Sequence, residues 1–158
     1  MTKAAKTLTF LMGLLILLSS ATALSAQEQE WTEKSLQQMY LDFLGEEGYR
    51  PEVDGDGDVR FKSEGLTYFI DVDEGDTEYF AIMLANIYEV ESAEERIRAL
   101  EACNTVSSTA KVIKGQIIND YIWLTAEVFV PDPRDFKSIF SRTMAALQAA
   151  QDTLEENL

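Results

Sequence analysis

The stretch that decides the fold is Lys111–Val130, KVIKGQIINDYIWLTAEVFV, in which two apolar runs flank Asn119 and Asp120. Both residues of this pair tolerate the positive φ angles that a two-residue turn between twisted strands requires. The stretch therefore predicts one long antiparallel hairpin, in which Ile118 lies opposite Tyr121.

The predicted hairpin has two unlike faces, because successive side chains of a strand point to opposite sides. The face expected to meet the core carries Ile113, Gly115, Ile117, Ile122, Leu124, Ala126 and Val128. The other face carries Val112, Lys114, Gln116, Ile118, Tyr121, Trp123, Thr125 and Glu127. This second face mixes aromatic and charged groups, which is typical of a partly wetted surface or a contact surface.

Outward from the hairpin, the spacing of apolar residues predicts three helices. The first begins at Thr32 and ends at Gly48, and the last begins after Pro133. The middle helix runs from Ser92 to about Asn104, with an inward stripe expected to hold Ile97, Leu100, Cys103 and Val106.

Three further strands are predicted before the middle helix. Alternating residues in 59–72 form a second hairpin that turns at Glu64 and Gly65, and residues 78–88 are apolar on both sides, as in a central strand. The expected fold class is α+β: an antiparallel five-stranded sheet with helices packed on one face, in the order α-β-β-β-α-β-β-α.

The N-terminal residues have the features of an export signal. Lys3 and Lys6 precede an apolar run over residues 8–18, which is too short to span a bilayer comfortably. Cleavage is expected after Ala26; cleavage after Ala23 and an uncleaved anchor are the alternatives. We therefore expect a signal peptide at residues 1–26 and a single domain at residues 27–158. The mature protein is expected to be periplasmic or secreted, without a membrane span.

Charge and composition exclude several functions. The 158 residues include 28 acidic and 13 basic ones, for a formal charge of −15, and such a surface repels nucleic acid. The chain has no histidine, Cys103 is its only cysteine, and no glycine-rich phosphate loop occurs. We expect no nucleic-acid partner, no cofactor and no enzymatic activity, although paired carboxylates remain a possible route to acid–base chemistry.

An acidic run has the first three ligand spacings of a calcium loop, at Asp54, Asp56 and Asp58. Val59 stands where the sharp turn of such a loop needs glycine, and Gly65 stands where the bidentate glutamate belongs. A solvated turn is therefore favoured over a metal site. Binding of a small molecule or divalent cation by the acidic loops is kept as the alternative function.

Three short motifs carry a resemblance to a known family. They are FLGEEGY at residues 43–49, DVRFKSEG at residues 58–65, and Asp135 with Phe136 at the start of the last helix. With the order of elements, they resemble the YbjN-like family over nearly the whole mature chain. The resemblance implies the fold of type III secretion chaperones, with helices packed on one side of an antiparallel sheet. It also implies frequent dimerisation, and it supplies no catalytic residues.

The sheet face without helices is the expected binding surface. Its candidate residues are of types that dominate contact hot spots: Arg60, Phe69, Ile118, Tyr121 and Trp123. The expected partner is a protein or peptide, or a second copy in a homodimer; cover by the chain's own C-terminal segment or a crossing loop is the alternative. The predicted function is a non-enzymatic, exported, chaperone- or adaptor-like interaction module of undefined physiological role.

Overall fold

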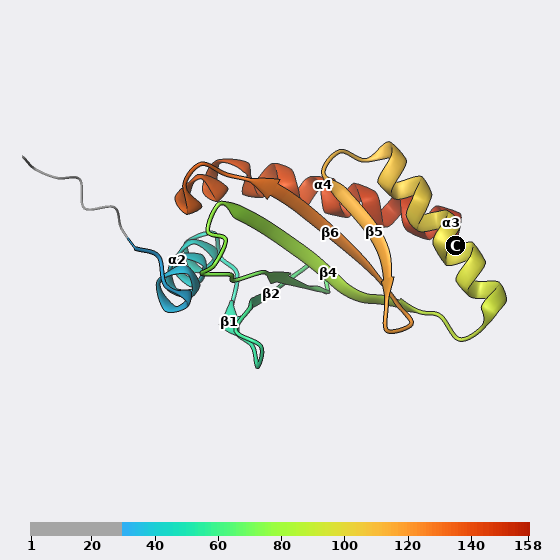
Figure 1. The fold of residues 1–158 in the computed structure, drawn as a ribbon, viewed down its shortest axis with the longest axis horizontal. Coiled ribbons are helices and arrows are strands. Elements are labelled where there is room, and N and C mark those ends of the chain that lie inside the picture. Colours follow the sequence, from blue (N-terminus) through green and yellow to red (C-terminus); the bar gives the residue numbers. More distant parts are fainter. Residues whose placement is uncertain (1–29) are drawn as a thin grey trace, which may run out of the picture. The chain divides into compact units, whose positions relative to one another are not determined.

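Strand β4, Tyr79–Glu89, lies inside the sheet, between β3 and β6, in the computed structural model. The structure describes residues 30–158, and Trp31–Leu158 forms one compact unit. The expected signal peptide therefore lies outside the described residues. Along the chain the elements are α2 (Glu33–Glu46), β1 (Glu52–Val53), β2 (Val59–Ser63), β3 (Leu66–Ile70), β4, α3 (Ala93–Thr109), β5 (Ile113–Ile118), β6 (Tyr121–Phe129), the 3-10 turn η1 (Pro133–Asp135) and α4 (Phe136–Asn157) (Figure 1).

The α+β class is confirmed, but the expectation of five strands is wrong by one. The antiparallel sheet has six strands in the order β1-β2-β3-β4-β6-β5. The extra strand, β1, is only two residues long, and Glu52 and Val53 pair with Arg60 and Val59 at the edge of the sheet. Both residues of β1 are exposed and follow a proline, so no apolar alternation marks them as a strand.

Both predicted hairpins have the turns that the sequence indicates. Asn119 and Asp120 have φ angles of 48° and 65°, and Ile118 lies opposite Tyr121. Glu64 and Gly65 also have positive φ angles, and they join β2 to β3. Two successive left-handed residues match the right-handed twist of the flanking strands, which fixes the register of each hairpin.

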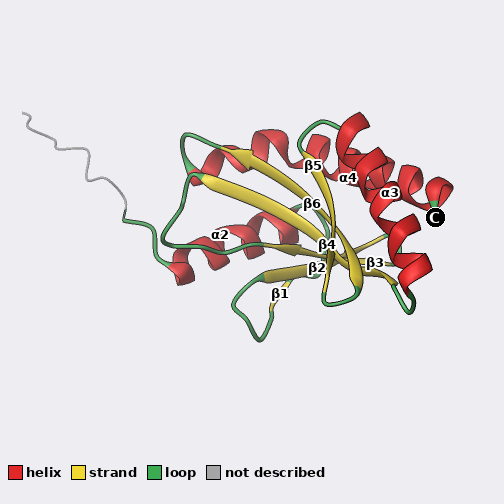
Figure 2. Cartoon of the chain, turned by 45° about the vertical axis from the view of Figure 1, so that its right-hand side comes forward, coloured by secondary structure: helices red, strands yellow, loops and turns green. Residues whose placement is uncertain are grey.

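The three helices of the described chain pack against one face of the sheet (Figure 2). Ile122 and Leu124 are fully buried on that face, as predicted. Phe136, at the start of α4, lies at the centre of an aromatic cluster. Its ring centroid is 4.9 Å from those of Tyr40 and Phe43, and 5.3 Å from that of Phe80. These contacts join α2 and α4 to the central strand.

The predicted inward stripe of α3 is only partly right. Cys103 and Val106 are buried, but Ile97 and Leu100 are 60% and 50% exposed. The helix instead buries a face of small residues, including Ala99 and Ala102. Close approach explains this rotation, because at Gly115 of β5 the backbones of helix and strand nearly touch. Large side chains on the buried face would hold the helix away from the strand.

Replacing Gly115 with alanine tests this close approach. An added Cβ would lie 3.0 Å from Cys103 Cα and 3.1 Å from the Cys103 carbonyl oxygen, so one backbone must move. We expect Gly115→Ala to lower the free energy of unfolding by about 1–3 kcal/mol in urea denaturation, as overpacked sites do. Gly45→Ala is the control, because a Cβ there meets nothing within 4 Å. Equal stability of Gly115→Ala and wild type would contradict the packing of α3 on β5.

Candidate functional site: the open face of the sheet

The sheet face opposite the helices, here called the open face, is built from every second residue of the paired strands. One cross-strand row shows its composition: Arg60, Phe69, Met83, Thr125 and Lys114 follow one another from β2 to β5. Thr125, which lies between Met83 and Lys114 in this row, is only 4% exposed. The open face therefore has an apolar centre with cations toward both sides.

The structure places the five predicted partner-binding residues on the open face, but in two groups. Ile118 lies directly opposite Tyr121, and Trp123 follows two residues further along β6. Arg60 lies opposite Phe69 on the other side of β4. Three strand spacings separate β2 from β6, which is about 14 Å. A single partner that contacts both groups must therefore lie across β4.

Arg60 is less available than the sequence suggests. Its guanidinium forms an ion pair with Glu52 of the unpredicted strand β1, at 2.9 Å. Lys114 is likewise paired with Glu127 across β5 and β6, at 2.6 Å. Both pairs are at least partly exposed to solvent, where such interactions contribute little to stability. Their side chains can exchange these partners for new ones at small cost.

Trp123 is half-buried on the open face, and the N–H group of its indole ring lacks a hydrogen-bond partner among the described residues. The Nε1 atom is sealed from solvent and has no hydrogen-bond acceptor within residues 30–158. An unsatisfied buried donor costs about 1–3 kcal/mol. Trp123→Phe should therefore keep the fold and most of the apolar surface, which makes it a matched control for more disruptive changes at this position.

Two residues of the open face are not among the contact residues that the sequence predicted. Met83 lies between Phe69 and Thr125 in the central row. Phe129 is 77% exposed, and its ring centroid lies 6.0 Å from that of Tyr79. The signal was present, because counting every second residue from Trp123 reaches Phe129. An exposed phenylalanine at a strand end is the kind of apolar group that contact surfaces use.

Carboxylates near Tyr79 give the open face an acidic side. Burial, together with the negative charges of Glu127 and Asp71, raises the pKa of Tyr79 to about 12. Burial also raises the pKa of Asp71 above its usual range, with smaller contributions from Asp73 and Glu127. These acids repel one another, so the folded state is under electrostatic strain at neutral pH.

Asp71→Asn is expected to stabilise the protein at pH 7. The pKa of Asp71 is raised in the folded state, so the folded protein binds this proton more tightly than the unfolded chain does. The resulting stabilisation is present below about pH 3.9, the pKa in the unfolded chain. It is lost as the pH rises through the pKa of the folded state. The variant should need more urea to unfold than wild type at pH 7, and the difference should shrink toward pH 3. Asp76→Asn, at an exposed acid, is the control. A destabilised Asp71→Asn at pH 7 would contradict this assignment.

The acidic loop uses its carboxylates to hold its own backbone. Asp54 Oδ1 accepts hydrogen bonds from the backbone N–H groups of Asp56, Gly57 and Asp58, at 2.9–3.1 Å. Asp58 Oδ1 accepts one from Val72 N–H at 3.1 Å, and burial raises the pKa of Asp58. Within residues 30–158 no group of three or more Asp, Glu or Cys side chains is arranged to hold a metal ion. The loop geometry favours a structural turn.

The remaining reactive group is the Cys103 thiol. It is buried where α3 approaches β5, and burial raises its pKa. A thiol held protonated and enclosed is a poor nucleophile. The structure therefore gives Cys103 a packing role.

No helix in the described part of the chain is both long enough and apolar enough to cross a bilayer.

Comparison with known proteins gives no further guidance: no family model matches the chain, and no curated protein matches it.

Proposed function

We propose that the protein is a non-enzymatic, exported protein-interaction module, and that its binding surface is the open face. The observation that carries the proposal is the one-sided packing of the sheet. All helices of the described chain lie on the other face, so no described helix covers the apolar groups of β3, β4 and β6. Surfaces of this kind are characteristic of sites for protein partners.

The arrangement of helices on one side of an antiparallel sheet is also what a resemblance to the YbjN-like family implies. We therefore include in the proposal that the chain has the fold of the type III secretion chaperones. Proteins of this fold are often dimeric, which suggests a second copy as one partner.

The charges of the open face favour a second copy as its occupant in the free protein. The face carries cations at Arg60, Lys62 and Lys114, and acids at Glu52, Asp71 and Glu127. A surface with both signs can be complementary to itself, as a symmetric dimer requires. In a symmetric dimer the cations of one copy can face the acids of the other, and each such contact occurs twice.

Solution mass tests the proposal. Light scattering is expected to give a dimer for wild type and for Trp123→Phe, because the phenyl ring keeps most of the apolar contact. Trp123→Asp is expected to give a monomer with a thermal unfolding transition close to that of Trp123→Phe, since the added charge lies on a half-exposed position. A dimeric Trp123→Asp would place the interface elsewhere. A monomeric wild type would exclude the second copy as occupant.

A further inference from the structure

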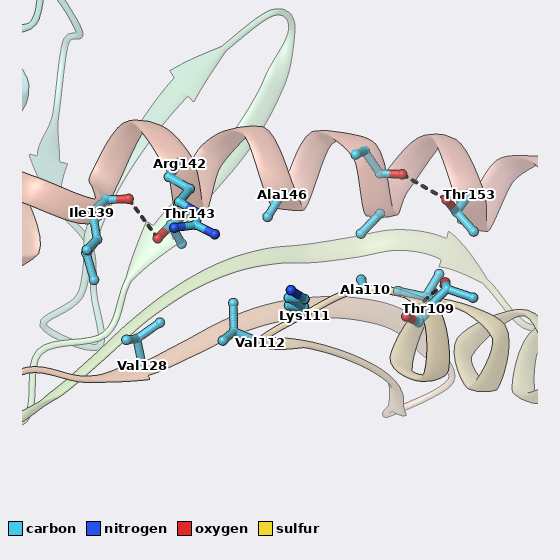
Figure 3. A pocket seen from close by; sticks show the side chains of 13 residues that line it. Thr109, Ala110, Lys111, Val112, Val128, Ile139, Arg142, Thr143, Ala146 and Thr153 are labelled. Atoms are coloured by element: carbon cyan, nitrogen blue, oxygen red, sulfur yellow. Dashed lines mark hydrogen bonds between the residues drawn. The ribbon is translucent and has the colours of Figure 1, made fainter.

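A groove lies on the helical side of the sheet, between α4, the end of α3 and the connection that enters β5. Its volume is about 620 Å³, which is within the range of small-molecule pockets. Figure 3 shows Val128 of β6 and Val112, just before β5, pointing toward α4, and Ala146 pointing toward them from α4. The groove is thus bounded by two walls that come from distant parts of the chain.

Small residues on α4 keep the groove open. Where α4 meets the rest of the core, it buries large side chains such as Phe136, Phe140 and Leu147. Along the groove it presents Ala146, Ala149 and Ala150. Leucine at these positions would fill much of the space, because well-packed interiors leave few voids larger than a water molecule.

Three threonines line the groove, but their hydroxyl groups offer it no free hydrogen-bond donor. The hydroxyl of Thr143 donates to the carbonyl oxygen of Ile139 at 3.0 Å, and that of Thr153 donates to Ala149 at 3.0 Å (Figure 3). The hydroxyl of Thr109 donates to Thr105 in the same way, at 2.7 Å. Each hydroxyl proton is therefore used within its own helix. The part of a ligand that lies along these threonines and the alanines of α4 is therefore expected to be apolar.

Both charged residues of the groove are cations. Arg142 comes from α4 and Lys111 from the connection below it (Figure 3). None of the lining residues is acidic, in a chain with 28 acidic and 13 basic residues. Within residues 30–158 neither cation takes part in an ion pair, whereas Lys114 and Arg134 nearby in sequence do. The groove is thus a local positive site on an acidic protein.

The backbone at Val112 supports a specific role for this region. Val112 has a φ angle of 58°, which is an outlier for a β-branched residue. Its carbonyl oxygen accepts a hydrogen bond from Glu127 N–H at 3.1 Å, which holds the residue in place at the start of β5. Such strained positions are concentrated at ligand sites, where the surrounding structure holds them.

We propose that this groove binds a single-chain amphiphile with an anionic head group, such as a medium-chain fatty acid. The acyl tail lies along the apolar wall formed by Val112, Val128, Ile139 and the alanines of α4. The carboxylate lies between Lys111 and Arg142, the only charged groups of the groove. The site is on the helical side of the sheet, so it does not depend on the open face or on dimerisation.

Isothermal titration calorimetry with decanoate and dodecanoate, below their micelle concentrations, tests the proposal on the purified protein. Both should bind saturably, and dodecanoate roughly fifteenfold more tightly, because it has two more methylenes and each buried methylene contributes about fourfold. Dodecyltrimethylammonium has the same tail with a cationic head and should bind at least tenfold more weakly. Acetate has the head group alone and should give no measurable heat.

Variants locate the site. Lys111→Gln combined with Arg142→Gln removes both cations from exposed positions, and should weaken dodecanoate binding at least tenfold. Lys34→Gln, at an exposed lysine of α2, is the control for lost charge and should bind as wild type does. Ala146→Phe should fill the groove and abolish binding.

The absence of saturable binding by wild type would overturn the proposal. Equal affinity of dodecanoate for wild type and the double glutamine variant would overturn it as well, and so would equal affinity for the two dodecyl compounds. Should Ala146→Phe fail to fold, the double glutamine variant still decides, because both of its positions are exposed.

Discussion

Leu124→Asp is expected to abolish cooperative unfolding of the protein. Leu124 lies in the middle of β6, and its side chain is fully buried on the face of the sheet that the helices cover. The change removes roughly 1.5–3 kcal/mol of apolar burial and places a carboxylate without a partner in the core, which costs several kcal/mol more. Together these losses approach the whole stability of a typical domain, about 5–15 kcal/mol. A thermal melt followed by circular dichroism measures the effect.

Phe129→Asp is the matched control, because it introduces the same residue into the same strand on the open face. Phe129 is 77% exposed, so the variant should lose little beyond its ring contact with Tyr79. It should melt cooperatively, close to the wild-type temperature. A cooperative melt of Leu124→Asp at the wild-type temperature would show that the two faces of β6 are assigned the wrong way round.

Phe136→Ala is expected to lower the free energy of unfolding by about 3–5 kcal/mol in urea denaturation, the usual cost of removing a buried aromatic ring. The ring is fully buried and lies edge-on to Tyr40 and Phe43 of α2. Its loss leaves a cavity where α2, α4 and β4 meet.

The control for Phe136→Ala is Phe69→Ala, which removes the same ring from the partly exposed open face. It should cost clearly less, because the ring leaves no enclosed cavity. Similar losses for the two variants would contradict the aromatic cluster as the centre of the core. Normal stability of Phe136→Ala would contradict the docking of α2 on α4.

Local signals explain which parts of the fold could be predicted from sequence. Thr32 caps α2 by accepting a hydrogen bond from Ser35 N–H, and Ser92 caps α3 by accepting one from Glu95 N–H. The turn at Asn119 and Asp120 fixes the register of the final hairpin, and its alternation fixes the two faces. These features depend on residues close together in the chain, so the sequence alone indicates them.

The features that the sequence did not indicate depend on contacts between distant segments. Strand β1 exists because β2 offers it an unpaired edge, and its own two residues carry no pattern. The rotation of α3 depends on Gly115, which lies outside the helix. The groove requires the small face of α4 to pass over Val112 and Val128, and no spacing within α4 reveals that.

The candidate binding surface divides in the same way. Ile118, Tyr121 and Trp123 share a face by simple alternation, and this was predictable. Two other features could not be predicted without the order of the strands. Arg60 forms an ion pair with Glu52 of β1, and β4 separates Arg60 and Phe69 from Tyr121 and Trp123. Sequence reasoning thus identified the open face but not the arrangement of its parts.

Site-specific photocrosslinking in cells tests the binding role of the open face most directly. A benzophenone amino acid would replace Phe69 or Tyr121 on the open face, and in a control Gln38, which is exposed on α2. We predict protein adducts from both open-face positions, including one with the mass of two copies, and none from position 38. Adducts from position 38 alone, or the absence of adducts from both open-face positions, would contradict a binding role for this face.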